Sequence, residues 1–252
     1  MQEELALLLQ AMPDEQRTRL AGRDFWRGHL EGQDVVVVLS RIGKVAAATT
    51  AALLLDRFDA RALVFTGVAG GLAAGVAVGD AVVATELLQH DLDASPIFPR
   101  YEVPLTGCAR FAADGAWHEA LVRAAHAALA DPEALLGSAA CRRFPLSAPR
   151  GHRGLIVSGD RFVSSAAESN ALRAALPDAL AVEMEGAAVA QVCHDFGVPC
   201  AVVRIISDRA DDDAHGDFQR FVAGVASHYS HAIVRGLLRQ PACLPTFAAR
   251  TG

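Results

Sequence analysis

Apolar residues in this chain follow two alternating patterns, short continuous runs and longer segments with helical spacing. Continuous runs with β-branched residues are typical of buried strands, and they predict strands at residues 33–40, 62–66, 81–85, 155–158, 179–182 and 201–207. Segments rich in alanine and leucine predict helices at residues 45–55, 116–129, 167–176, 185–196 and about 218–238. The intervening residues 141–153, rich in Arg, Pro and Ser, are expected to form a loop.

This alternation of strands and helices predicts an α/β fold. We expect a single three-layer α/β/α domain over residues 1–252, with a central twisted sheet that is mixed and mostly parallel. Hydrophobic residues make up 52% of the chain and charged residues only 21%, which is enough apolar material for a large core.

The net charge and the hydropathy of the chain limit the classes of partner and the cellular location that are expected for the protein. The formal net charge of −6 argues against nucleic acid and anionic membrane surfaces as partners. No apolar run is long enough to span a bilayer, and the first residues, Met-Gln-Glu-Glu, lack the pattern of a signal peptide. A cytoplasmic protein is therefore expected.

Cysteine and histidine spacing gives no sign of a metal or a disulfide framework. The five cysteines are odd in number and have no CxxC spacing: Cys108, Cys141, Cys193, Cys200 and Cys243. We expect reduced, mostly buried thiols. The nine histidines form no H-x-x-x-H motif or His/Cys cluster, so neither a metal nor another cofactor is expected.

Two carboxylates follow strand-like runs near the end of the chain. Glu185 lies in Val-Glu-Met-Glu-Gly (182–186), and Asp208 ends Arg-Ile-Ile-Ser-Asp (204–208). Ligands of open α/β sheets bind beyond the carboxyl ends of strands, so both are candidates for chemistry. The alternative is two solvated carboxylates, one of them at a helix start where negative charge is favourable.

A glycine-rich stretch and two further blocks complete the set of motifs. Residues 64–71 (Val-Phe-Thr-Gly-Val-Ala-Gly-Gly) predict a strand running into a glycine-rich turn, where backbone N–H groups can approach a ligand. This stretch is neither a G-x-G-x-x-G fingerprint nor a P-loop. The other blocks are residues 40–48 (Ser-Arg-Ile-Gly-Lys-Val-Ala-Ala-Ala) and 154–163 (Gly-Leu-Ile-Val-Ser-Gly-Asp-Arg-Phe-Val).

In this order, the motifs resemble the 5′-methylthioadenosine/S-adenosylhomocysteine nucleosidase family of the nucleoside phosphorylase/hydrolase superfamily. The resemblance runs from residue 1 to about residue 221. It implies a nucleoside phosphorylase-like fold, a homodimer, a role in methionine salvage and a nucleoside substrate. The implied reaction is hydrolysis of the N-glycosidic bond of 5′-thio-substituted adenosines, which releases adenine and the thioribose.

The resemblance also implies three catalytic roles. Asp208 would protonate N7 of adenine, with Ser207 holding its carboxyl group in a dry pocket that keeps the proton available near neutrality. Glu185 would bind the ribose hydroxyls and favour the cationic transition state. Glu4 corresponds to the residue that activates the attacking water, although a solvated carboxylate at a helix start is the alternative.

The implied binding residues are mostly apolar. Phe162 would stack on adenine, the backbone of Val163 would read its edge, and Met184 would pack on the ribose. Phe162 and Met184 are equally compatible with the core. Gly70 and Val68 would line the ribose side, and Val68 replaces the serine of the family.

Other polar residues have structural interpretations. Arg204 is a candidate for an ion pair with a carboxylate rather than a substrate contact. His90-Asp91 is expected to make a structural hydrogen bond, and residues 211–213 (Asp-Asp-Asp) a solvated acidic loop.

Two regions depart from the family. Residues 95–104 differ from its usual sequence, and within them Phe98 is the candidate contact to the active site of a partner subunit. In the family a strand precedes the Met1–Glu4 motif, so we expect a truncated start that leaves Glu4 on an untethered end. Residues 240–252 are expected to be disordered.

Three alternatives to the nucleosidase remain open. A phosphorylase of the same fold would need a phosphate cradle, for which Arg41 is the only nearby arginine. A futalosine-type hydrolase is the second alternative. The third is a purine-binding protein with impaired catalysis, which the missing strand and Val68 favour.

Overall fold

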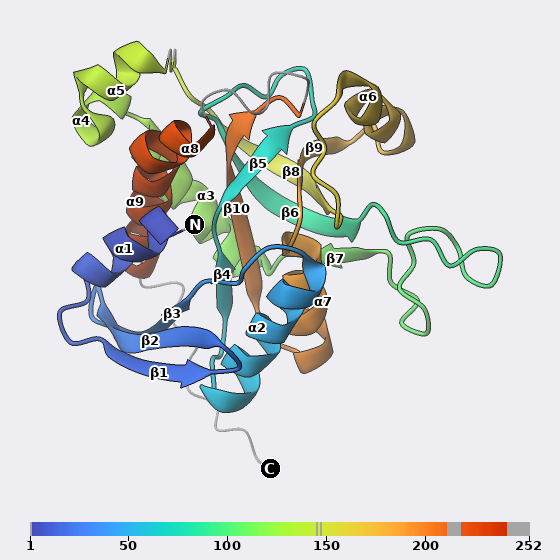
Figure 1. Cartoon of the computed structure of the whole chain (residues 1–252), viewed down its shortest axis with the longest axis horizontal. Coiled ribbons are helices and arrows are strands. Elements are labelled where there is room, and N and C mark those ends of the chain that lie inside the picture. The colour runs from blue at the N-terminus through green and yellow to red at the C-terminus, as the bar shows by residue number, and fades with distance from the viewer. Residues whose placement is uncertain (1, 145, 147, 211–217, 241–252) are drawn as a thin grey trace.

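The structure is a computed structural model that describes residues 2–144, 146, 148–210 and 218–240. Its main element is a mixed seven-stranded sheet with the strand order β4-β10-β5-β9-β8-β6-β7. In that order the strands are Leu63–Phe65, Cys200–Asp208, Val68–Gly71, Ala179–Glu183, Gly151–Ser158, Ala81–Gln89 and Arg110–Ala112. The predicted α/β fold with a mixed central sheet is confirmed (Figure 1).

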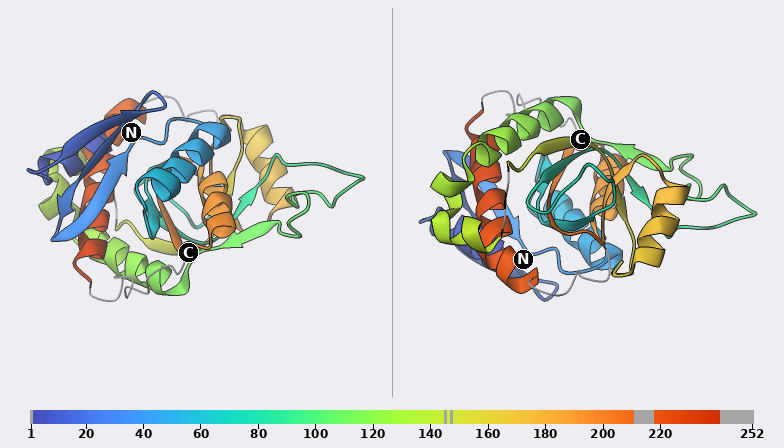
Figure 2. Two further views of the ribbon diagram at one scale, coloured as in Figure 1. Left: turned by 90° about the horizontal axis from the view of Figure 1, so that it is seen from below. Right: turned by 90° about the horizontal axis from the view of Figure 1, so that it is seen from above.

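Helices cover both faces of this sheet (Figure 2). On one face α2 (Lys44–Arg57) packs beside α7 (Gly186–Phe196), and their alanines meet the apolar residues of the strands. On the other face α3 (Gly115–Leu129) packs against α9 (Ser227–Leu238). The small alanines of α2, α3 and α7 let the helices approach the strands closely, so alanine content as well as helical spacing specifies these layers.

The shorter helices refine the sequence-based expectations. The prediction of a loop over residues 141–153 is partly wrong, because α5 (Ser138–Arg143) extends into this range and β8 begins at Gly151. The Asp131 carboxylate accepts a hydrogen bond from Ala134 N at 3.0 Å and so begins α4 (Pro132–Leu136). The remaining helices are α6 (Ala166–Ala175) and α8 (Phe218–Phe221), and a π-helical turn (Val222–Ala226) joins α8 to α9.

Residues 68–71 are a strand, not the predicted glycine-rich turn. β5 pairs in parallel with β10 (Val68 with Ile205, Gly70 with Asp208) and antiparallel with β9 (Gly70 with Val182). A Cβ on Gly70 would lie 2.8 Å from Ala210 Cβ and 3.0 Å from Asp208 Oδ1. Glycine at this position therefore lets the end of β10 close over β5 rather than forming a turn.

The N-terminal part forms a second sheet that was only partly predicted. β1 (Gln16–Leu20), β2 (Arg23–Leu30) and β3 (Gln33–Val38) are antiparallel, and tight turns at Ala21-Gly22 and Glu31-Gly32 join them with positive φ angles. β3 was predicted to be buried, but it is only half-buried, because its outer edge faces a cleft instead of another strand.

This cleft has a volume of about 940 Å³ and separates β3 from β4. Helix α1 (Gln2–Gln10) lies along it and packs on α9. The expectation that Glu4 sits on an untethered end is wrong: the side of α1 that carries Glu4 and Leu8 is buried. Leu8 packs with Met12 and Leu30, which fixes the helix against the small sheet.

Two expectations lie outside the described residues, the acidic loop 211–213 and nearly all of the tail 240–252. Among the residues that the structure describes, no helix is long and apolar enough to cross a membrane.

Candidate active site

Three strands of the main sheet end close together, and their last residues carry polar side chains. β8 ends at Ser158, β9 at Glu183 and β10 at Asp208. β8 and β9 are parallel, with Ser158 opposite Glu183. β10 runs antiparallel to β9, but Gly70 of β5 pairs with both Val182 and Asp208, so this register places the end of β10 beside the end of β9.

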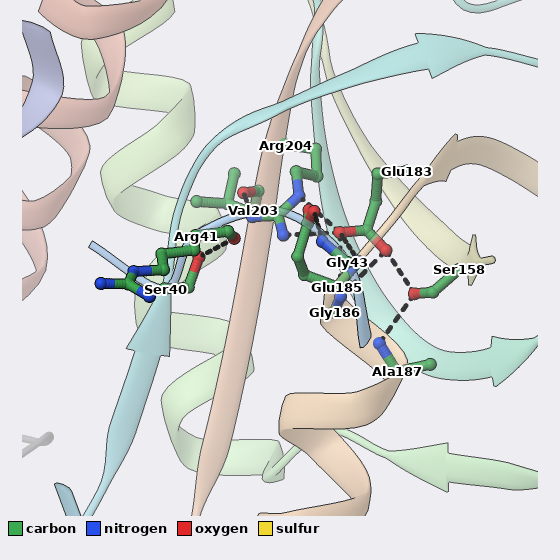
Figure 3. Close-up of polar contacts among 10 residues, drawn as sticks. All are labelled: Ser40, Arg41, Gly43, Ser158, Glu183, Glu185, Gly186, Ala187, Val203 and Arg204. Atoms are coloured by element: carbon green, nitrogen blue, oxygen red, sulfur yellow. Dashed lines mark hydrogen bonds and ion pairs between the residues drawn. The ribbon is translucent and has the colours of Figure 1, made fainter. Parts of the chain in front are cut away.

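A buried ion pair forms the base of the site (Figure 3). Arg204 Nη2 lies 2.6 Å from Glu183 Oε2, and their side chains are 1% and 2% exposed. The Arg204 guanidinium also stacks over the Phe65 ring, 4.1 Å from its centroid. The ion pair with a carboxylate that was expected for Arg204 is confirmed.

Glu183 also organises the start of α7. Its carboxylate accepts hydrogen bonds from the Glu185 and Gly186 backbone N–H groups at 3.1 and 2.9 Å, and from the Ser158 hydroxyl. Ser158 in turn accepts from Ala187 N at 2.8 Å. Glu183 was not among the candidate site residues predicted from the sequence, although it is a second carboxylate two residues before Glu185.

Glu185 points from the start of α7 toward the start of α2. Its Oε1 accepts a hydrogen bond from Gly43 N at 2.9 Å, across 142 residues of sequence. Gly43 has φ of 92°, which positions this N–H at the positive end of the helix. Burial and the neighbouring Glu183 charge raise the pKa of Glu185, against the opposing effect of Arg204.

Asp208 is held by its own turn at the end of β10. Ser207 Oγ donates to Asp208 Oδ2 at 2.7 Å, and Ala210 N donates to Oδ1 at 2.8 Å. The pairing of β5 with β10 shifts register between Ile206 and Asp208, at Ser207. Because of this irregularity, the Ser207 hydroxyl turns toward both Asp208 and the carbonyl of Ala69, which is 3.4 Å away.

Glu4 and Glu185 line one cavity although they come from opposite ends of the chain. The cleft beside β3 reaches the site, where Glu4, Val68, Glu185 and Arg204 are among its lining residues. Gly70, Ser207 and Asp208 are grouped beside it by the pairing of β5 with β10. The fold therefore brings Glu4 of α1 and Glu185 of α7 to one cavity, and Asp208 of β10 lies outside the residues that line it.

The candidate binding residues are distributed more widely. Val163 is buried in a cluster with Val182 and Ala210, beside the turn that holds Asp208. Phe162 is 45% exposed, and Met184 is half-buried between the two glutamates. Phe98 lies on the long loop between β6 and β7, which projects away from the strand ends (Figure 1), so this chain does not bring it to its own Asp208.

Comparisons with known proteins agree with this arrangement. A family model described as the phosphorylase superfamily matches residues 1–239. A 5′-methylthioadenosine/S-adenosylhomocysteine nucleosidase of Anoxybacillus flavithermus is 37% identical over 233 residues, which cover 92% of this chain and 93% of that protein.

Solved structures give the same result. A 5′-methylthioadenosine/S-adenosylhomocysteine nucleosidase of Neisseria meningitidis, in complex with methylthio-immucillin-A, has a TM-score of 0.82 and 37% identity, with 95% of each chain covered. A futalosine hydrolase of Helicobacter pylori has a TM-score of 0.78 and 30% identity, with 94% of each chain covered.

The chain therefore belongs to the phosphorylase superfamily, a class of α/β proteins. Within this class it belongs to the family of 5′-methylthioadenosine/S-adenosylhomocysteine nucleosidases. Among the described residues, no group of three His, Cys, Asp or Glu side chains is arranged to hold a metal ion.

Proposed function

We propose that this protein is a hydrolase that cleaves the N-glycosidic bond of 5′-thio-substituted adenosines, 5′-methylthioadenosine and S-adenosylhomocysteine. The observation that supports this most directly is the Asp208 carboxyl group, held by Ser207 and Ala210 beside the cavity that Glu4 and Glu185 line. Relatives with these two substrates in their names match more than nine tenths of the chain.

In the proposed reaction, Asp208 transfers its proton to N7 of adenine. The C1′–N9 bond then breaks, and its electron pair leaves with adenine. The ribose carries oxocarbenium-like charge, which the Glu185 carboxylate favours. Water adds to C1′ and loses a proton to Glu4, so the products are adenine and the thioribose.

The binding roles follow the same assignment. Phe162 stacks on adenine, the backbone of Val163 contacts its edge, Met184 packs on the ribose, and Gly70 and Val68 line the ribose side. The burial of Val163 next to the Asp208 turn supports its place beside the base.

The proposal includes a cytoplasmic homodimer that acts in methionine salvage. Ile97 and Leu105, on the loop that carries Phe98, are 82% and 92% exposed. Large exposed apolar side chains commonly mark an interface, which supports contact of Phe98 with the active site of a partner subunit. Light scattering at micromolar concentration tests this assembly: a dimer is expected, and a monomer contradicts it.

Hydrolysis is favoured over phosphorolysis by the position of Arg41. Arg41 Nη2 donates a hydrogen bond to the carbonyl oxygen of Gly22, on the small sheet. The one arginine proposed for a phosphate cradle is therefore engaged elsewhere. Futalosine is the second candidate substrate, since the Helicobacter pylori structure matches at 30% identity.

The test is purine release from 5′-methylthioadenosine, S-adenosylhomocysteine and futalosine, each measured with and without phosphate by chromatography. We expect adenine from the first two at a rate that phosphate does not change. Ribose 1-phosphate products would instead identify a phosphorylase. Binding of adenine without release from any substrate would identify a purine-binding protein.

A further inference from the structure

Three segments of the site that are distant in sequence are joined in a closed ring of polar contacts. Lys44 Nζ lies 2.6 Å from Asp91 Oδ1. Asp91 Oδ2 accepts a hydrogen bond from Asp160 N at 2.8 Å. Asp160 Oδ1 accepts one from Lys44 N, also at 2.8 Å, which closes the ring.

The ring lies between two parts of the proposed substrate site. On one side, Lys44 is the first residue of α2 and follows Gly43, whose N–H binds Glu185. On the other side, Asp160 begins the short segment that leads to Phe162 and Val163. Asp91 follows β6 and joins the two. The ring therefore connects the ribose carboxylate to the residues proposed to hold the base.

Two side chains of the ring are largely buried, and the backbone beside its third residue is closely packed. The Lys44 and Asp91 side chains are only 15% and 28% exposed. Burial opposes the charge of Asp91, yet Lys44 and the Asp160 N–H hold the pKa of Asp91 below its ordinary value. The His90 ring occupies the space where a Cβ on Gly159 would lie, so the backbone just before Asp160 is closely packed.

An ordinary surface ion pair would have a different structure. The Arg153–Glu119 pair is an example: its side chains are 47% and 50% exposed, and it lies toward the opposite end of β8. Exposed pairs of this kind contribute little to stability, because solvent screens both charges. In the ring, each oxygen of Asp91 has its own partner. One partner is the Lys44 ammonium group, and the other is the backbone N–H of Asp160, which begins the segment proposed to bind the base.

We propose that Lys44 and Asp91 are positioning residues for purine recognition, which hold residues 160–163 in register with Glu185 through the ring. The inference rests on the proposed function for the identity of the base. Neither residue is assigned contact with the reacting atoms. Their effect is to fix the place where adenine is bound before its bond to ribose is cleaved.

The test compares Lys44→Met and Asp91→Asn with two reference variants. Arg153→Met is the matched control for loss of an ion pair, and Lys44→Arg keeps the positive charge. For each protein we would measure kcat and KM with 5′-methylthioadenosine, and the Kd of adenine by calorimetry.

We expect Lys44→Met and Asp91→Asn to raise KM and the adenine Kd at least about tenfold, because small misplacements of binding groups are costly. Values of kcat should stay within about threefold of the original, since the acid Asp208 is unchanged. Lys44→Arg, which keeps the positive charge, should retain much of the adenine affinity that Lys44→Met loses. The double variant should be little worse than the worse single variant, because both act through one ring.

Hydrogen exchange of the backbone amides at residues 159–163 gives a readout that does not depend on catalysis. Faster exchange is expected in Lys44→Met and Asp91→Asn, but not in Arg153→Met. Unchanged exchange together with unchanged adenine binding would overturn the proposal, and so would a loss confined to kcat. If the unaltered protein neither binds nor releases adenine, the proposed function fails, while the exchange rates still decide whether the ring holds this segment.

Discussion

Arg204 Nη2 and Glu183 Oε2 lie 2.6 Å apart, and both side chains are almost completely buried. Every oxygen of the Glu183 carboxylate is used, by Arg204, by Ser158 and by the N–H groups at the start of α7. The same pair joins β9 to β10, and Glu183 lies two residues before Glu185. It therefore fixes the relative positions of the two motifs that carry Glu185 and Asp208.

Removing one member of this pair should be severely destabilising. Glu183→Gln removes the carboxylate that pairs with the buried Arg204, which is expected to cost about 3–5 kcal/mol in the free energy of unfolding. Urea denaturation measures this loss. Glu119→Gln, which breaks the exposed Arg153–Glu119 pair, is the control and should cost less than about 1 kcal/mol. Equal effects in the two variants would contradict a structural role for the buried pair.

Asp208→Asn should abolish adenine release and leave nucleoside binding within about tenfold, because it removes a proton donor used in the transition state. Turnover of 5′-methylthioadenosine and the Kd of a non-hydrolysable analogue test the two halves of this prediction. A variant that keeps more than about a tenth of the original turnover would show that Asp208 is not the general acid.

Glu185→Gln should lower kcat by at least about 10²-fold, because it deletes a charge directed at the developing cation. The raised pKa of Glu185 adds a pH dependence. Glu185 loses its charge as pH is lowered through this raised pKa. On acidification, kcat should therefore begin to fall at a higher pH than it would with an ordinary glutamate. A variant altered only in KM would show that Glu185 binds ribose without assisting the chemistry.

Glu31 should make stability depend on acid pH. Hydrogen bonds from Arg239 and Arg235 lower its pKa to about 2, so the contact is stabilising above the pKa of about 4.3 in the unfolded chain. That stabilisation is lost as pH falls toward 2. Glu31→Gln should therefore lower the melting temperature near neutral pH and have little effect near pH 2, as calorimetry can show. Asp34→Gln, at the exposed pair with Arg27, is the control.

The cleft between β3 and β4 should accept one more strand. Within the described part of the chain, β3 and β4 each end a sheet with an unpaired edge, and the β-branched residues of β3 are only half-buried. A protein extended ahead of Met1 by an apolar strand of about six residues and a turn is expected to melt at a higher temperature and to be more active. A matched extension of Gly and Ser residues is the control. Equal melting temperatures and activities for both extensions would show that the cleft does not take a strand.

The sequence by itself determined the layers and the motifs. Apolar periodicity located α2, α3, α7 and the strands that end at Glu183 and Asp208, because local patterning follows from which face of each element is buried. The family motifs located the candidate carboxylates Glu4, Glu185 and Asp208. The chemistry of those motifs depends on residue type and order, both of which a sequence shows directly.

Only the tertiary structure decided how these parts meet. Residues 68–71 looked like a turn, and they are a strand because β9 and β10 supply partners from more than 100 residues away. Residues 33–40 were predicted to form a buried strand, yet among the residues that the structure describes no further strand pairs with the outer edge of β3. The Arg204–Glu183 pair and the ring of Lys44, Asp91 and Asp160 join distant segments. Local propensity carries no information about such contacts, because they depend on which strand lies beside which.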